Sequence, residues 1–301
     1  MVRLYIIRHG DPDYDTNREN GGTLTEHGRK EAESLAPFLS QKAKITHAYS
    51  SPLYRARLTA QLGLKDIDDF NTLEKFESNC VVEEWSRELS SWRVKGMIQN
   101  NGSGKDYAMW DFPPNLIRKQ LNGLVNEVSD AKSEEERCDP KNWYESCPEH
   151  SAYITEYNEV CKESDDFLSR HGIIKCQYTG LYKMSKTEMA NPSKREARIA
   201  IFCHCGLALT WLSHLLSIPL PSVYSSFWLA PSSVTTILFD EQPSRHQVLD
   251  RNISEDIDFV YMTPRALCVG GTDHMSMAGL ETKNTYKEEW KRPSGIKHNF
   301  W

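Results

Sequence analysis

Two apolar segments of the chain end in a histidine that is closely followed by a glycine. The first is YIIRHG, Tyr5 to Gly10, and the second is IAIFCHCG, Ile199 to Gly206. A short apolar run bounded by a turn signal is typical of a buried strand that is leaving its sheet. In open α/β sheets, ligands bind outside the carboxyl ends of the strands. We therefore expect His9 and His204 to lie at that edge of a sheet.

The segments after the first of these runs alternate between helix-like and strand-like patterns. TLTEHGRKEAESLAPFLSQ starts with Thr25 as a helix cap and carries apolar residues at helical spacing. ITHAYSS is strand-like, and PLYRARLTAQLGL predicts a second helix with Pro52 in its first turn. This alternation predicts a three-layer α/β/α fold with a mostly parallel central sheet.

The alternation stops between about residues 86 and 150. This part is rich in Trp, Asn, Asp, Pro and charged residues, with one helix-like stretch, NLIRKQLNGLVNEV. Long irregular segments in a compact domain are usually functional loops or surface insertions. We therefore predict a single domain over residues 1–301. Its parts are a core at about 1–90 and 151–265, an insertion or cap at about 91–150, and a C-terminal tail at about 280–301.

The remaining core elements are expected in the second half of the chain. We predict a helix over about 151–170, a hairpin that uses GLYKMSK as one arm, and a buried helix within 206–220. SSVTTILFD and IDFVYM predict two late strands.

The charge balance and the cysteines limit the function classes. The chain has 36 basic and 42 acidic residues, a net charge of −6, which argues against a general nucleic-acid or membrane binder. The eight cysteines show no paired metal-ligand spacing, and the N-terminus lacks a secretion-signal pattern. The longest apolar run, 206–220, is too short to span a bilayer. We therefore expect a cytoplasmic protein with reduced thiols.

Four motifs of the chain, in this order, resemble those of the histidine phosphatase superfamily, also called phosphoglycerate mutase-like. They are RHG at Arg8 to Gly10, SSPLYRARLTA from Ser50, the acidic segment VVEEWSREL from Val81, and FCHCG from Phe202. The chain is most similar to the branch that carries an RHGDPDY opening and a CHxG second histidine. LTEHGRKEA also resembles a supporting helix of the family, with Glu31 in place of the usual glutamine.

The resemblance implies phosphoryl transfer through a phosphohistidine on His9. A neutral imidazole is a competent nucleophile, and the planar donor forks of Arg8 and Arg55 suit phosphate oxygens. His204 and the backbone amides around Cys205, at a helix start, would add further phosphate-binding donors. This catalytic set would need neither a metal nor another cofactor.

The proton donor for the leaving group is expected in the acidic segment. The family places a glutamate after the second helix, and WSREL resembles its motif most closely at Glu88. Glu84 is the second candidate and Glu83 the third. A carboxyl that acts as an acid near neutral pH needs its pKa raised by burial, for which we expect Trp85 or Trp92 to contribute, and by a dianionic substrate.

We expect a phosphatase that hydrolyses a small-molecule phosphomonoester and releases phosphate. Two alternatives stay open: a mutase that keeps the phosphate in the same pocket, and a catalytically silent phosphate-binding protein. We expect no nucleic-acid or membrane partner, and the oligomeric state, a homodimer included, stays open. The aromatic residues of the 91–150 insertion are candidates for its own core or for the substrate pocket.

Overall fold

The computed structural model describes residues 1–90, 93–94, 107–108, 110, 150–176, 180–241 and 258–282. The insertion and the tail predicted from sequence therefore lie almost entirely outside the described residues, as does the predicted helix NLIRKQLNGLVNEV. The described pieces of the insertion include the paired strands β6 (Arg93–Val94) and β7 (Tyr107–Ala108), and Trp110.

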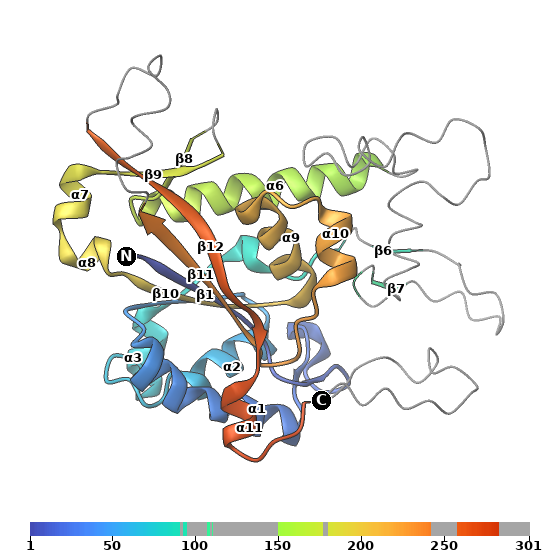
Figure 1. Cartoon of the computed structure of the whole chain (residues 1–301). Coiled ribbons are helices and arrows are strands. Elements are labelled where there is room, and N and C mark those ends of the chain that lie inside the picture. Colours follow the sequence, from blue (N-terminus) through green and yellow to red (C-terminus); the bar gives the residue numbers. More distant parts are fainter. Residues whose placement is uncertain are drawn as a thin grey trace, which may run out of the picture.

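The described part of the chain is organised around one eight-stranded sheet (Figure 1). Its strand order is β5-β4-β10-β1-β11-β12-β9-β8. The strands are β1 (Arg3–Arg8), β4 (His47–Ser50), β5 (Cys80–Val82), β8 (Ile174–Lys175), β9 (Tyr182–Ser185), β10 (Arg198–Cys203), β11 (Val234–Glu241) and β12 (Phe259–Gly271). A separate small hairpin joins β2 (Pro12–Asp13) to β3 (Thr23–Leu24).

Most strands of this sheet run in one direction. β5, β4, β10 and β1 pair in parallel, and from β1 onward each neighbour is antiparallel. Among the described strands of this sheet, only β11 and β9 therefore run against β1. The prediction of a mostly parallel sheet is confirmed, and the reversal at β11 is a feature that the sequence pattern did not indicate.

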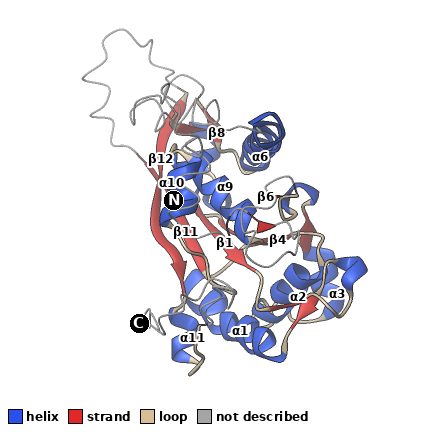
Figure 2. Cartoon of the chain, turned by 90° about the vertical axis from the view of Figure 1, so that its right-hand side faces the viewer, coloured by secondary structure: helices blue, strands red, loops and turns tan. Residues whose placement is uncertain are grey.

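Helices cover both faces of the sheet. One face carries α1 (Glu26–Pro37), α2 (Tyr54–Gly63), α3 (Leu73–Asn79) and α11 (Asp273–Met277), and the other carries α6 (His150–Arg170), α9 (Cys205–Leu216) and α10 (Leu220–Ser226). Figure 2 shows the strands between these two groups of helices. The short helices α7 (Lys186–Ala190) and α8 (Pro192–Arg195) precede β10. The single turns η1 (Arg18–Asn20) and η3 (Glu84–Ser86) lie in connections, and η2 (Phe38–Ala43) is a π-helix that directly follows α1. The three-layer arrangement is confirmed.

The interior residues of β1 and β10 are apolar because both faces of these strands are buried. In β1, Leu4 and Ile6 pack in the core under α6 and α9, whereas Tyr5 and Ile7 pack in the core on the α1 and α2 side. β10 divides its residues in the same alternating way. Strand side chains alternate between faces, so a continuous apolar run is expected for a strand covered on both sides.

The first helix shows how local signals place the loop after β1. Thr25 caps α1 by accepting a hydrogen bond from the amide of Gly28, an interaction worth about 1 kcal/mol. A Cβ on Gly28 would lie 2.2 Å from the carbonyl oxygen of Asp11, and one on Gly10 would lie 2.5 Å from the carbonyl oxygen of Gly28. The two glycines therefore allow the loop after β1 to lie directly against the start of α1.

Several element boundaries differ from the sequence-based expectation. Pro52 precedes α2, which begins at Tyr54, instead of lying in its first turn. The late strand predicted over IDFVYM continues to Gly271, so the sheet extends beyond the predicted core limit at residue 265. The helix predicted over 151–170 and the hairpin that contains GLYKMSK are confirmed, the latter as β8 and β9.

The parallel strands bring the sequence motifs to one edge of the sheet. β1 and β10 are in register so that Arg8 lies opposite Cys203, and Phe202 lies opposite Ser50 of β4. The residues that follow these three strands are His9, His204 and Ser51. The fold thereby brings together residues that are far apart in the sequence.

Candidate active site

His9 is held rigidly at the end of β1. Its amide donates to the carbonyl of Cys203 at 3.0 Å, and its own carbonyl accepts from the amide of Ser232 at 3.1 Å. The ring is buried, with Nδ1 2.7 Å from the carbonyl oxygen of Gly10. A carbonyl can only accept a hydrogen bond, so Nδ1 carries the proton and Nε2 keeps its lone pair.

The surroundings of His9 favour its neutral form. Burial lowers its pKa well below the usual value, and the positive charges of Arg55 and Arg8 lower it further. The imidazole is therefore uncharged at neutral pH, with the Nε2 lone pair available.

Arg55, on α2, is a buried cation whose three nitrogens have different surroundings. Nη2 lies 3.0 Å from Nδ1 of His204, and Nη1 donates to the carbonyl of Gly21. Nε makes no hydrogen bond to any residue that the structure describes. A buried guanidinium with an unused donor is chemically suited to an anion.

The Gly21 contact explains why a glycine occurs in the loop between β2 and β3. Gly21 has a φ of +86°, and a Cβ there would lie 2.9 Å from Cδ2 of Leu53 and 3.1 Å from Nη1 of Arg55. Its carbonyl can reach Arg55 because no side chain intervenes.

His204 lies beside His9, immediately before α9. The two ring centroids are 5.1 Å apart. Nε2 lies 2.8 Å from Oγ of Ser51, and because the guanidinium of Arg55 can only donate to Nδ1, the ring proton is on Nε2. Burial, followed by the charge of Arg55, lowers the pKa of His204 well below its usual value, so this ring is also neutral.

Arg8, the last residue of β1, is fixed by the segment that follows α10. Its Nη1 donates to the carbonyl of Leu229 at 2.6 Å, and its Cζ lies 6.0 Å from the ring centroid of Trp228. Its charge acts on His9, His204 and Glu88, whose pKa values it lowers. The structure thus brings Arg8, His9, Arg55 and His204 together at one edge of the sheet.

Glu88 reaches the same place through the N-terminus of α9. Its carboxylate accepts from the amide of Leu207 at 3.1 Å and from that of Gly206 at 3.4 Å. Burial raises the pKa of Glu88, while the charge of Arg55 and the amide hydrogen bonds oppose this rise. The carboxyl is therefore held beside the arginines in a setting that favours its protonated form.

The start of α9 differs from the expectation in one respect. We expected the amides around Cys205 to face a phosphate, but the amide of Gly206 is directed at Glu88. Cys205 itself is buried, with its Sγ 4.0 Å from the carbonyl oxygen of Leu229.

The two alternative acids have other contacts. Glu83 is buried and pairs with Arg170 of α6 at 2.8 Å, and its Oε2 accepts from the indole of Trp85 at 3.0 Å. Glu84 is on the surface, 3.0 Å from Nη2 of Arg87. Trp85, which we expected beside Glu88, therefore contacts Glu83, and Trp92 lies outside the described residues.

Three residues that support this site had no role predicted from the sequence. Ser51 contacts His204, and Thr59 Oγ1 accepts from the amide of Gly10 at 3.0 Å while donating to the carbonyl of Arg55 at 2.8 Å. Glu31, buried on α1, accepts from the amide of Asp11 at 2.8 Å. Ser51 and Thr59 belong to the SSPLYRARLTA motif, so their place in that motif could have identified both as residues near the site.

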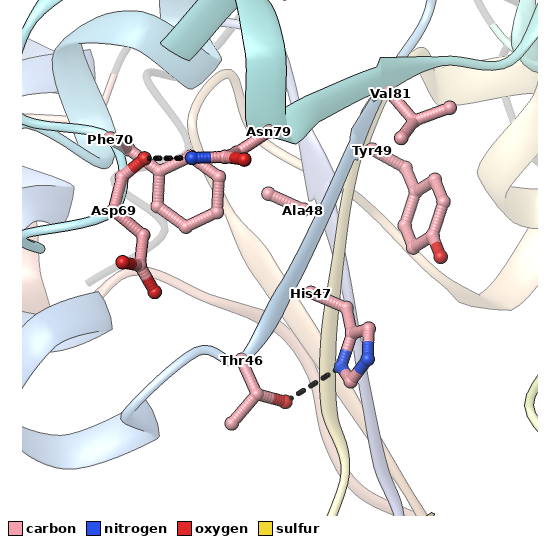
Figure 3. A pocket seen from close by; sticks show the side chains of 8 residues that line it. All are labelled: Thr46, His47, Ala48, Tyr49, Asp69, Phe70, Asn79 and Val81. Atoms are coloured by element: carbon pink, nitrogen blue, oxygen red, sulfur yellow. Dashed lines mark hydrogen bonds between the residues drawn. The ribbon is translucent and has the colours of Figure 1, made fainter. Parts of the chain in front are cut away.

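A separate cavity of about 330 Å³ lies along β4 and β5 (Figure 3). It is lined by Thr46, His47, Ala48, Tyr49, Asp69, Phe70, Asn79 and Val81. It follows the body of β4, whereas the site described above follows the carboxyl end of that strand. None of the predicted site residues lines it.

In the described ranges, no group of three or more His, Cys, Asp or Glu side chains is arranged to hold a metal ion. No helix in that part of the chain has both the length and the apolar character that a membrane crossing requires.

Several known proteins are similar to this chain. A phosphoglycerate mutase-like protein 4 from Arabidopsis thaliana is 38% identical over 65 residues, which cover 20% of this chain and 28% of the relative. A probable phosphoglycerate mutase GpmB from Escherichia coli is 30% identical over 122 residues, 34% of this chain and 56% of the relative. The chain thus spans about half or less of the length of these curated relatives.

Among solved structures, a phosphoserine phosphatase from Entamoeba histolytica in complex with phosphoserine is 16% identical, with a TM-score of 0.47, over 91% of this chain and 100% of that one. A phosphoglycerate mutase from Bacillus anthracis is 19% identical, with a TM-score of 0.47, over 92% of this chain and 96% of that one. The family model of the histidine phosphatase superfamily (branch 1) matches residues 4–77, which include Arg8, His9 and Arg55. Residues 4–77 of this chain are therefore similar to the histidine phosphatase superfamily.

Proposed function

We propose that this protein is a phosphatase that hydrolyses a phosphomonoester through a phosphohistidine on His9, without a metal. The observation that carries the proposal is the state of His9: a neutral imidazole with its Nε2 lone pair available, next to the positive charges of Arg55 and Arg8. A neutral nucleophile beside two cations can attack the phosphorus of a phosphate dianion that the cations hold in place.

In the first step, Nε2 of His9 forms a bond to phosphorus and the ester P–O bond breaks. The protonated carboxyl of Glu88 gives its proton to the leaving oxygen, which departs as the alcohol. The carbonyl of Gly10 stabilises the positive charge that develops on the imidazole through its bond to Nδ1–H. Arg8 and Arg55 bind the phosphoryl oxygens throughout.

In the second step, water attacks phosphorus and the N–P bond breaks. The Glu88 carboxylate takes a proton from this water, so inorganic phosphate leaves and both residues return to their starting states. His204 orients Arg55 through Nδ1, and its Nε2–H is the donor that it can redirect from Ser51 to a phosphoryl oxygen.

The test is phosphate release from a panel of phosphomonoesters in the presence of EDTA. We expect turnover by the native protein and by His47→Ala, a matched histidine variant in the separate cavity, and none by His9→Ala. An alkaline quench during turnover should trap a phosphoryl group on the native protein and none on His9→Ala. Turnover that survives in His9→Ala would overturn the proposal.

A mutase is the second candidate because the relatives from Arabidopsis thaliana and Escherichia coli carry phosphoglycerate mutase names. It would use the same first step but return the phosphoryl group to a reoriented acceptor instead of water. Conversion of 3-phosphoglycerate to its 2-isomer faster than phosphate release would favour the mutase. Release without isomerisation would favour the phosphatase.

A further inference from the structure

Each of the two arginines at the site has an aromatic ring against it, and both rings are exposed. The Tyr14 ring centroid lies 5.4 Å from Cζ of Arg55, and the Trp228 ring centroid lies 6.0 Å from Cζ of Arg8. Tyr14 is 54% exposed and Trp228 is 39% exposed. We call Tyr14 and Trp228 the aromatic pair.

The backbone is shaped to place both members of the aromatic pair. Gly22 has a φ of +83°, and a Cβ on this residue would lie 3.2 Å from Cδ1 of Tyr14. A glycine therefore leaves room for the Tyr14 ring. Gly270, with a φ of +66°, leaves room for the backbone of Trp228, because a Cβ there would lie 2.5 Å from its carbonyl oxygen. The residue after Trp228, Leu229, accepts the hydrogen bond from Arg8. The rings and the arginines are therefore positioned together.

The positions of the two rings indicate which part of a bound substrate they would contact. In the proposed mechanism Arg8 and Arg55 hold phosphoryl oxygens with their N–H edges. Each ring lies within about 6 Å of one of these guanidinium carbons. The next part of the substrate beyond the ester oxygen would therefore lie near the aromatic pair. Large, exposed aromatic surfaces at a binding site gain most from a flat apolar partner, because stacked or edge-to-face rings add to the gain from burial.

We propose that the substrates of this site are phosphomonoesters whose alcohol carries an aromatic ring within a few bonds of the ester oxygen. This inference rests on the proposed phosphatase function and adds the class of its substrate. It distinguishes the site from one built for a small, highly charged ester, which would gain from further cations at the places that Tyr14 and Trp228 occupy.

The rings could act on the arginines alone, by stacking on the guanidinium groups and fixing their orientation. In that case, removing a ring would slow every ester by the same factor. Recognition of the substrate ring would instead change the ratio between an aromatic ester and a non-aromatic one. The experiment therefore measures ratios of kcat/KM.

The first substrate pair is 2-phenylethyl phosphate and 2-cyclohexylethyl phosphate, whose alcohols are close in acidity and size but differ in ring planarity. The second pair is adenosine 5′-monophosphate and ribose 5-phosphate, which places the ring beyond a sugar. We expect the native protein to favour the aromatic member of at least one pair by about 10-fold, which corresponds to about 1.4 kcal/mol. The pair that shows the preference identifies the distance of the ring from the ester.

The variants are Tyr14→Ala and Trp228→Ala, with Tyr54→Ala as control because Tyr54 is an exposed tyrosine, 40% accessible, on α2. We expect the two test variants to lower the preference at least threefold, mainly through KM, and Tyr54→Ala to keep it. Ratios near one in both pairs for the native protein, or a preference that neither variant changes, would overturn the inference. Failure of the native protein to hydrolyse any ester, p-nitrophenyl phosphate included, would instead count against the proposed function itself.

Discussion

Nη2 of Arg55 lies 3.0 Å from Nδ1 of His204, across a separation of 149 residues in the sequence. A guanidinium has no acceptor, so this contact fixes the tautomer of His204 as well as the orientation of Arg55. It also joins α2 to the residue before α9, so the SSPLYRARLTA and FCHCG motifs are in direct contact through these two side chains. A change at Arg55 should therefore alter both phosphate binding and the state of His204.

Replacing Arg55 by lysine should lower kcat/KM by about 100-fold to 1,000-fold, the cost typical of losing one preorganised donor in a transition-state site. Lysine keeps the positive charge but cannot contact Gly21, His204 and a phosphoryl oxygen together, as the planar guanidinium can. Steady-state kinetics on one phosphomonoester measure the effect.

The control for this variant is Arg57→Ala, on the same helix. Arg57 pairs with Glu77 at 2.5 Å, away from the site residues. We expect nearly native kcat/KM for Arg57→Ala. If Arg55→Lys were as active as the native protein, charge alone would account for the role of Arg55, and the geometric argument would be wrong.

Replacing Glu88 by glutamine should slow alkyl esters by about 100-fold or more, the range typical of losing a general acid. The same change should have little effect on p-nitrophenyl phosphate, whose leaving group needs little protonation. Glutamine has nearly the same shape, and its one carbonyl oxygen can keep the hydrogen bond at the Oε1 position from the amide of Leu207, while the weaker contact of Oε2 with the amide of Gly206, at 3.4 Å, is lost. The ratio of the two rates is the measurement.

Glu84→Gln is the matched control, because Glu84 is on the surface beside Arg87. It should leave both rates unchanged. The raised pKa of Glu88 also predicts a pH dependence: the carboxyl is protonated below that pKa and loses its proton above it, so alkyl ester hydrolysis should fall as pH rises through it. An equal loss on both substrates in Glu88→Gln would show that Glu88 is not the proton donor.

The sequence predicted the elements whose signals are local. The apolar runs of β1 and β10, the Thr25 cap of α1 and the histidine after each strand are all readable within a few residues. Placing His9 beside His204 then needed only the assumption of parallel strands, which β1 and β10 satisfy. This part of the site was therefore accessible from the sequence alone.

Features that depend on distant contacts were not predictable in the same way. β12 extends to Gly271 through Pro264 and Arg265 because it pairs with β11 over that stretch, although the local residues do not look like a strand. The hydrogen bonds from the start of α9 to Glu88 and from Arg55 to Gly21 join segments that only the fold brings together. Such contacts depend on where the fold places the loops, which the residue types of each segment do not indicate.

The stability of the fold should depend on pH through a buried histidine outside the site, His171. Burial, followed by the neighbouring His47, lowers the pKa of His171 from 6.5 to about 3. The folded state thus binds fewer protons than the unfolded state between these values. Its stability should fall by about 1.4 kcal/mol per pH unit from this group as pH falls from 6.5 towards 3.

Urea unfolding at several pH values between 4.5 and 7 measures this dependence. His171→Gln should make the free energy of unfolding less dependent on pH, since glutamine does not titrate. The slope should decrease by an amount that corresponds to about one bound proton. Tyr49→Phe is the control: it removes the hydroxyl that lies 3.0 Å from Nε2 of His171, so it should lower stability but keep the slope. An unchanged slope in His171→Gln would show that His171 titrates alike in the folded and unfolded states.

Trp110, a described residue of the insertion, packs on the start of α9. The amides of Gly206 and Leu207 there donate to Glu88. A Cβ added to Gly206 would lie 2.3 Å from Cζ3 of Trp110. Gly206→Ala should therefore destabilise the fold by about 1–3 kcal/mol, the usual cost of overpacking, and should weaken alkyl ester hydrolysis because the amide of Gly206 donates to Glu88.

The test of this contact is a double-mutant cycle with Trp110→Ala, followed by chemical unfolding. Removing the indole makes room for the added methyl group, so Gly206→Ala should cost much less in the Trp110→Ala background than in the native one. Equal costs in the two backgrounds would show that Trp110 does not pack on Gly206 in solution. A smaller cost in the Trp110→Ala background would establish that this residue of the insertion contacts the start of α9, next to the carboxyl that we propose as the proton donor.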